Sequence, residues 1–201
     1  MKKPNFIIAG FPKCGTTSLH HHLNEHPQIF MPSQKELHFF TIKILSKLKT
    51  GPKDKIVKET QIDSSEKYLR HFKKVKNETA IGDASPSYIN YPSEFSKIKK
   101  YLNDPKLIIV LRDPINRAYS NYLHLKREQR ETLSFKEAIY AEDKRIKNKY
   151  SDFWYYKFNS TYFEKIVKAK AIFSDVLILT VEELNKDPNK TIKKVYKFLE
   201  V

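Results

Sequence analysis

The spacing of apolar residues along the chain predicts strands that alternate with helices. Four short apolar runs are typical of buried strands, at residues 6–9, 79–82, 106–111 and 176–180, the second being the weakest. Helix-compatible patterns follow two of these strands, over residues 16–24 and 116–127. This alternation predicts an α/β fold in three layers, with a central parallel sheet flanked by helices on both faces.

In such a sheet, ligands bind beyond the carboxyl ends of the strands, so we expect the site to lie after Ala9, Gly82 and Leu111. Residues 47–65 mix Lys, Asp, Thr, Gly and Pro with little periodicity, and we interpret them as a surface excursion. The length of 201 residues fits a single domain over residues 1–201.

Composition narrows the class of protein. The chain contains 13 Phe, 12 Tyr and one Trp, enough bulky surface to organise a core, which excludes global disorder. No apolar run approaches the roughly 20 residues that cross a bilayer, so we predict neither a membrane span nor a signal peptide. Cys14 is the only cysteine and cannot form an internal disulfide, which favours a cytoplasmic location.

The charge balance indicates anionic partners without naming one. The 38 Lys and Arg residues exceed the 23 Asp and Glu residues, for a net charge of +15. An RNA or polyanion binder is therefore one hypothesis. The lysine runs at 97–100 and 144–149 are typical of solvated helix faces, however, and we expect no nucleic-acid partner.

The histidines do not form a metal-binding pattern. His20, His21 and His22 follow one another within a helix pattern, where successive side chains point about 100° apart and cannot converge on one ion. His22 and His26 have the i, i+4 spacing, but two ligands alone do not make a metal site. We therefore predict no metal site.

The loop between the first strand and the first helix has the composition of a phosphate-binding loop. Gly10 and Gly15 are spaced so that the backbone can curl its N–H groups inward ahead of a helix N-terminus. Nucleotide hydrolases carry a lysine directly after the second glycine, whereas here Thr16 takes that place and Lys13 lies inside the loop. The loop predicts a P-loop-like fold and an anionic ligand. A kinase or nucleotide hydrolase that uses ATP and Mg²⁺ is the alternative.

Two segments together resemble a known family. Residues 12–19, PKCGTTSL, match the P-K-x-G-T-S/T-S/T-L loop of sulfotransferases that use 3′-phosphoadenosine 5′-phosphosulfate (PAPS). Residues 112–122, RDPINRAYSNY, match that family's second element, R-D/N-P-x-x-R-A-x-S-x-Y after a strand. The chain resembles a bacterial member, closest in motif to the carbohydrate and heparan-type enzymes. The resemblance implies sulfuryl transfer from PAPS to a hydroxyl or amine of a carbohydrate or small-molecule acceptor, with adenosine 3′,5′-bisphosphate (PAP) as product.

The resemblance also implies roles for individual residues. The 5′-phosphosulfate would be bound by Lys13, Cys14, Gly15, Thr16, Thr17 and Ser18. Arg112 and Ser120 would hold the 3′-phosphate, since a guanidinium offers a fork of donors and a hydroxyl farther along the helix adds another. No metal is needed, because Lys13 and the loop amides can neutralise the charge that Mg²⁺ handles in kinases.

Residues 35–40, KELHFF, resemble the K-E-x-x-F/Y-F segment that supplies the base in glycosaminoglycan sulfotransferases. Sulfuryl transfer needs a base for the acceptor hydroxyl and a cation beside the leaving phosphate, and Glu36 and Lys13 would fill those roles. His38 could instead be the base, because imidazole titrates near neutral pH. Both residues are candidates.

Residues 82–88, GDASPSY, resemble the loop near the family's acceptor site, but Asp83 and Ala84 stand where glycosaminoglycan enzymes often carry a lysine. This difference argues against a heparan-like acceptor. Residues 160–162 and 181–184 match weaker landmarks of the family. We expect the acceptor surface to be built by loops, at residues 47–61, 85–91 and 129–134.

The chain ends at Val201, where the family usually continues for several dozen residues. We therefore expect the single sulfotransferase domain to lack the family's C-terminal segment, which commonly brings a basic loop over the nucleotide. If that segment is required for catalysis, the 201-residue chain is inactive; if not, it is active.

Overall fold

The computed structural model describes residues 2–57 and 62–201. Its strands form one parallel sheet in the order β2-β3-β1-β4-β5. Their bounds are β1 Phe6–Ile8, β2 Ile29–Phe30, β3 Ala80–Ala84, β4 Lys106–Leu111 and β5 Val176–Thr180. Every residue of β1 and β3 is buried, as expected for parallel strands with both faces covered.

Four strands were predicted from the sequence and all four are present. β4 and β5 have the predicted bounds, and β1 ends one residue early, at Ile8. The weak strand expected at 79–82 is displaced to Ala80–Ala84, so Asp83 and Ala84 belong to the strand and not to the following loop. β2 was missed because two residues are too few to show a period.

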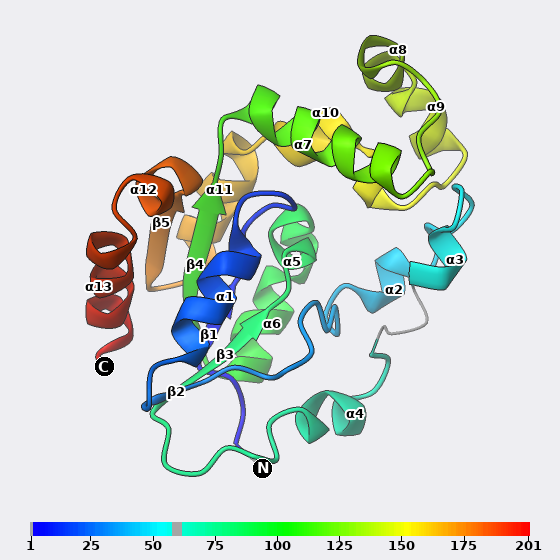
Figure 1. Ribbon diagram of the computed structural model, residues 1–201. Helices are drawn as coiled ribbons and strands as arrows, with labels where there is room; N and C mark the ends of the chain where they lie inside the picture. The colour runs from blue at the N-terminus through cyan, green and yellow to red at the C-terminus, as the bar shows by residue number, and fades with distance from the viewer. Residues whose placement is uncertain (1, 58–61) are drawn as a thin grey trace.

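Helices connect the strands and cover the sheet. Around the sheet they are α1 Thr16–Asn24, α5 Ser87–Asn90, η1 Pro92–Glu94, α6 Phe95–Leu102, α11 Phe163–Ile172, α12 Val181–Lys186 and α13 Pro188–Leu199. Helix α1 packs against β2 and α13, whereas α11 packs against α5 and α6. Figure 1 shows α1 in front of the sheet and α11 behind it. The predicted three-layer, P-loop-like α/β fold is therefore confirmed.

The remaining helices lie beyond the sheet layers. They are α2 Ile42–Leu45, α3 Asp54–Val57, α4 Ser65–Arg70, α7 Pro114–Arg127, α8 Phe135–Tyr140, α9 Glu142–Lys147, η2 Asp152–Trp154 and α10 Tyr156–Ser160. Tyr68 of α4 is nevertheless buried in the main core beside β3. Figure 1 shows α7 to α10 forming an arch above the arrowhead of β4. A hydrophobic cluster of their own holds the arch together, with Trp154 and Leu125 among its buried members. The arch thus faces the carboxyl ends of the strands.

Two sequence expectations need adjustment in this region. Helix α7 begins at Pro114, two residues earlier than predicted, because Asp113 caps it: the N–H of Asn116 donates to Asp113 Oδ1 at 2.8 Å. The excursion expected at 47–65 is not wholly on the surface, since Asp54 is buried. Residues 58–61 of that excursion lie outside the described residues. No helix in the described part of the chain is both long enough and apolar enough to cross a membrane.

Candidate active site

Two glycines shape the loop between β1 and α1. A side chain at Gly10 would come within 2.9 Å of the backbone of Val110 on β4, so only glycine fits at this point. Gly15, the N-cap of α1, has a φ of 82°, in the left-handed region that favours glycine. Lys13 between them also has a positive φ, of 68°, which is uncommon for a residue with a side chain. The backbone is therefore curled ahead of the helix, as the glycine spacing predicted.

The N-terminus of α1 is open to an anion. Gly15 provides no capping side chain, and the first turn contains no acidic residue. The first N–H groups of a helix have no intrahelical partner and carry partial positive charge, so an anion is stabilised there. Lys35 adds a second cation beside Lys13, since its Nζ donates to Thr17 Oγ1 at 2.6 Å.

Arg112 follows β4, and the parallel pairing of β4 with β1 places it beside the loop. Its Nη1 donates to the carbonyl of Lys13 at 3.3 Å. Its own carbonyl accepts a hydrogen bond from the Tyr162 hydroxyl at 3.0 Å. Ser120, on α7, lines the same cavity as Arg112. Arg112 and Ser120, which are expected to bind the same phosphate, thus line the same cavity.

Glu36 and His38 lie on a segment without regular secondary structure, and hydrogen bonds attach this segment to the end of β3. The N–H of Glu36 donates to the carbonyl of Ala84 at 2.9 Å, and the N–H of His38 donates to Ser85 Oγ at 3.3 Å. Both residues have left-handed backbone, with φ of 59° and 54°. Such strain persists only where surrounding contacts enforce it, and it is concentrated at functional sites.

The side chain of His38 is held between Ser87 and Glu36. Its Nδ1 is 2.7 Å from Ser87 Oγ, and its Nε2 is 3.6 Å from Glu36 Oε2. The side chain of His38 is 18% exposed, whereas that of Glu36 is 54% exposed. Glu36 is therefore the more accessible of the two candidate bases.

Charge in the cleft changes the acidity of both candidate catalytic groups. Burial opposes ionisation of Glu36, but the contact with His38 and the charges of Lys35 and Lys13 outweigh it and hold the pKa of Glu36 below its usual range. Burial, together with the neighbouring Arg127 guanidinium, lowers the pKa of Lys13. Glu36 is therefore a carboxylate at neutral pH, the form that a base requires.

A cavity of about 560 Å³ joins these parts at the carboxyl ends of the strands, as predicted. The predicted site residues that line it are Lys13, Gly15, Thr16, Thr17, Glu36, His38, Arg112 and Ser120. Two others do not line it. Cys14 is buried in the core, where burial raises the pKa of its thiol to about 11, and Ser18 is exposed on α1.

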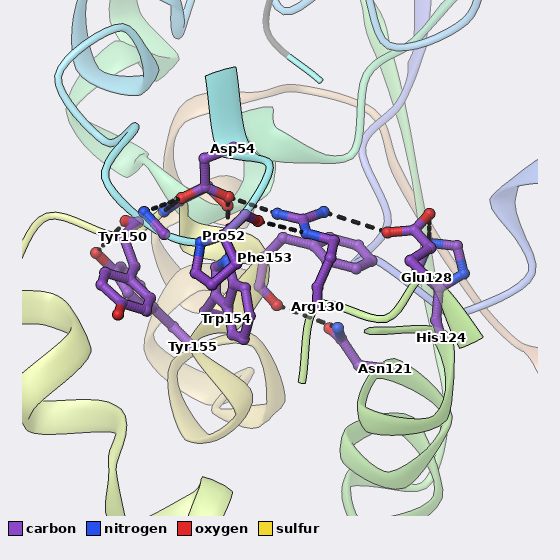
Figure 2. Close-up of polar contacts among 12 residues, drawn as sticks. Pro52, Asp54, Asn121, His124, Glu128, Arg130, Tyr150, Phe153, Trp154 and Tyr155 are labelled. Atoms are coloured by element: carbon purple, nitrogen blue, oxygen red, sulfur yellow. Dashed lines mark hydrogen bonds and ion pairs between the residues drawn. The ribbon is translucent and has the colours of Figure 1, made fainter. Parts of the chain in front are cut away.

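Asp54 holds together the far wall of the cavity (Figure 2). Its buried carboxylate accepts hydrogen bonds from the Arg130 guanidinium, the Trp154 indole, the hydroxyl and N–H of Ser151, and the N–H of Gly51. Arg130, whose side chain is only 4% exposed, also donates to the Pro52 carbonyl at 2.9 Å and to Glu128 at 3.3 Å. Three segments that are distant in the sequence thus form one wall.

His124 and Glu128 are cavity residues that the sequence analysis missed. They lie four and eight positions after Ser120, and His124 Nε2 is 3.0 Å from Glu128 Oε1 (Figure 2). Burial and the charge of Lys13 lower the pKa of His124. The i, i+4, i+8 spacing from Ser120 is the signal that could have found them, because such residues share one helix face.

The histidine run of α1 is partly structural. His20 is buried, and its Nε2 donates to the Pro32 carbonyl at 3.0 Å. Its ring packs edge-on against that of His21. Over residues 2–57 and 62–201, no three His, Cys, Asp or Glu side chains are grouped so that they could hold a metal ion.

Solved structures similar to this chain include sulfotransferases. The crystal structure of a sulfotransferase from Alicyclobacillus acidocaldarius matches the whole chain with a TM-score of 0.97 and 37% identity, and the match covers 82% of that structure. Mouse sulfotransferase SULT7A1, solved in complex with PAP, matches with a TM-score of 0.60 and 18% identity. The match covers 100% of this chain and 59% of that one, and at this identity it shows a shared fold alone.

Two relatives are similar in sequence over about two thirds of the chain. Membrane-associated sulfotransferase kil1 of Dictyostelium discoideum is 34% identical over 148 residues, which are 69% of this chain and 28% of the relative. Carbohydrate sulfotransferase 15 of Mus musculus is 29% identical over 166 residues, 68% of this chain and 30% of the relative. The chain thus spans less than a third of the length of either relative. The model of the sulfotransferase family matches residues 4–201, and the chain belongs to that family.

Proposed function

We propose that this chain contains the catalytic core of a sulfotransferase that moves a sulfuryl group from PAPS to a hydroxyl or amine of a carbohydrate or small molecule. One observation carries the proposal: Lys13, in the loop before the uncapped N-terminus of α1, and the Glu36 carboxylate line one cavity, and both have left-handed backbone. The acceptor class is supported by a relative's name, carbohydrate sulfotransferase 15. Family membership and the absence of a lysine after Gly15 disfavour a kinase.

The residues around the loop fit the donor. The uncapped N-terminus of α1 and Lys13 would hold the 5′-phosphosulfate, and Arg112 with Ser120 would hold the 3′-phosphate. When bound, PAPS supplies an activated sulfuryl group on a phosphate leaving group. The two cations and the loop N–H groups stabilise the negative charge of such a ligand, and the proposal gives no role to a metal ion.

Glu36 and Lys13 would act on the two bonds that change. Glu36 takes the proton of the acceptor hydroxyl as the acceptor oxygen bonds to sulfur. Lys13 stabilises the negative charge left on the phosphate oxygen as its bond to sulfur breaks. His38 would orient Glu36 through their 3.6 Å contact, or replace it as the base. The far wall held by Asp54 would face the acceptor.

The proposal extends to the organisation of the protein. Residues 1–201 would act as one domain, which the uninterrupted family match over 4–201 supports. A cytoplasmic location is supported by Cys14, a lone cysteine whose side chain is buried and unpaired.

Calorimetric titration with PAP and with ATP, each with and without Mg²⁺, tests the proposal. We expect PAP to bind without magnesium and more tightly than ATP. Lys13→Ala should weaken PAP binding, whereas Lys100→Ala, on the exposed face of α6, should not. Tighter, magnesium-dependent binding of ATP would replace the proposal with the kinase alternative. Equal losses in the two variants, with a steep dependence on salt, would indicate a nonspecific polyanion binder.

A further inference from the structure

Arg117, on α7, is fully buried directly beneath the phosphate loop. Its guanidinium reaches three separate parts of the chain. It donates to Ser160 Oγ at 2.7 Å, the Tyr156 carbonyl at 2.9 Å, Asn121 Oδ1 at 3.0 Å and the Pro12 carbonyl at 3.4 Å. Of these partners, Pro12 lines the cavity. Arg117 does not line the cavity itself and contacts the loop through the backbone of Pro12.

All four of these acceptors are neutral. No carboxylate in the described ranges lies within 4.0 Å of the Arg117 nitrogens. Glu142 attracts Arg117 from farther away, but its oxygens accept the N–H groups of Lys157 and Phe158. Cys14 cannot supply a counter-charge at neutral pH, because burial raises its pKa to about 11. A buried cation without a paired anion costs free energy, and Arg117 has no such anion among the described residues.

The bond to Pro12 also orients the loop backbone. The chain has no cis peptide bond in its described residues, and in a trans peptide the carbonyl and the next N–H point in opposite directions. Since Arg117 binds the Pro12 carbonyl from below, the Lys13 N–H points away from Arg117. One residue thus contributes both a fixed charge under the loop and an outward-facing donor on it.

Residues 160–162 contact both Arg117 and the loop between β1 and α1. They match a family landmark to which no role was assigned from the sequence. Ser160 Oγ accepts from Arg117 and donates to the Pro114 carbonyl at 3.0 Å, which ties it to the start of α7. Tyr162 donates to the Arg112 carbonyl, and its ring lies 4.4 Å from that of Phe11 at the base of the loop. The loop between β1 and α1 and the Arg112 segment, both proposed to bind phosphate, are therefore held by contacts with residues 160–162.

We infer that Arg117 is a positioning residue that makes the loop selective for the 5′-phosphate of the donor, with that phosphate completing the charge pair that the fold leaves open. The inference rests on the proposed function, because it requires a phosphate over the loop. Arg117 touches no ligand itself and acts through the backbone of Pro12 and through its charge.

The affinities of PAP, adenosine 3′-monophosphate and adenosine 5′-monophosphate give the contribution of each phosphate to binding. The ratio of the Kd of adenosine 3′-monophosphate to that of PAP gives the gain from the 5′-phosphate, and the corresponding ratio for adenosine 5′-monophosphate gives the gain from the 3′-phosphate. Arg117→Met should reduce the 5′-phosphate gain on the order of 10-fold, the effect that Coulomb's law gives for a unit charge about 10 Å away at an effective dielectric constant of about 20. The 3′-phosphate gain should be unchanged. Arg112→Ala should show the opposite pattern.

Two further variants separate charge from packing. Arg117→Lys keeps the charge but not the fork of donors, and Ser160→Ala removes one partner while keeping the guanidinium. Both should melt at a lower temperature yet retain most of the 5′-phosphate gain. These two variants decide the matter if Arg117→Met does not fold, because a residue that served packing alone would lose binding in step with stability.

The results separate this inference from the proposed function. If the wild-type chain gains no affinity from the 5′-phosphate, the proposed function fails and this inference fails with it. If the wild-type chain does gain affinity, but Arg117→Met keeps that gain or Arg117→Lys loses it completely, only the role of Arg117 is wrong.

Discussion

Asp54→Asn should strongly destabilise the protein, because Asp54 is the common acceptor of the far wall. Its Oδ2 accepts the N–H groups of Gly51 and Ser151, while Oδ1 accepts from Arg130, Ser151 and Trp154. An amide has one oxygen, so at least two of these donors lose their acceptor in either orientation. At about 1.5–3 kcal/mol for each hydrogen bond to a charged group, and about 3–5 kcal/mol for breaking a buried ion pair, we expect a loss of about 3–5 kcal/mol.

The only tryptophan of the chain makes this prediction directly measurable. Trp154 donates to Asp54 Oδ1 at 3.0 Å, so urea unfolding followed by its fluorescence reports on the wall itself. For a domain of this size the loss corresponds to a decrease in Tm of roughly 10 °C. PAP affinity should be retained, because Asp54 lies across the cavity from the loop.

A double variant tests the reason for the loss. Asp54→Asn leaves Arg130 buried beside a neutral amide, so replacing Arg130 by Met as well should cost less than the sum of the two single changes. A loss below about 1 kcal/mol in Asp54→Asn, or strict additivity in the double variant, would refute the argument that the wall is held by a buried ion pair.

The remaining predictions concern the loop and the base, with turnover measured on an acceptor identified by a radiolabelled-donor screen of extract fractions. Glu36→Gln should lower turnover roughly 10²- to 10⁴-fold with PAP affinity near wild type. Because its pKa is held below the ordinary 4.5, a Glu36 base stays ionised until the pH falls through that lowered pKa, so turnover should not show an acid limb between pH 7 and 5. Arg112→Ala should weaken PAP binding by about 1.5–3 kcal/mol in calorimetry, whereas Lys13→Ala should reduce both binding and turnover. Cys14 should react with Ellman's reagent only as the protein unfolds, since its buried thiol has a pKa of about 11.

The predictions for Glu36, Lys13 and Cys14 each have a result that would contradict them. Activity in Glu36→Gln together with its loss in folded His38→Ala would make His38 the base, and an acid limb near pH 6.5 would point to an imidazole in the same way. Unchanged PAP affinity in Lys13→Ala would remove the loop lysine from donor binding. Rapid labelling of Cys14 in the folded protein would contradict its burial.

The residues proposed to bind the donor could be picked out from the sequence because they lie close to the ends of the strands. Lys13 and Arg112 each lie within a few positions of a strand end, and the five consecutive apolar residues 107–111 in β4 give a clear signal. Where a strand is only two residues long, as in β2, no period exists to be detected. The end of β3 was misplaced for a related reason: Asp83 is polar, yet it lies buried in the strand, where Ser85, Tyr68 and Tyr88 donate to it.

The far wall could not be predicted in the same way, because its contacts are between distant positions. Asp54 meets Arg130 across 76 positions and Ser151 across 97. Each of these residues alone is typical of an exposed loop, and their burial depends on how Trp154 packs in the arch. A lone Asp in a Lys-rich segment carries no local sign of such partners. His124 and Glu128, in contrast, share a helix face with Ser120 and could have been found.

The division of the cavity between strand ends and connecting segments has a consequence for how acceptor preference can change over evolution. The loop with Lys13 and Arg112 are positioned by the pairing of β1 with β3 and β4, whereas Ser120 and Arg117 lie on α7 of the arch. The opposite half joins segments around residues 51–54, 128–130 and 151–154, and each of them completes its hydrogen bonds only with the others. A chimera that receives one of these segments from another family member would therefore contain unpaired hydrogen-bond donors or acceptors. A chimera that receives all three segments would keep these hydrogen bonds complete. If the far wall faces the acceptor as proposed, we expect acceptor preference to change only when all three segments are exchanged together.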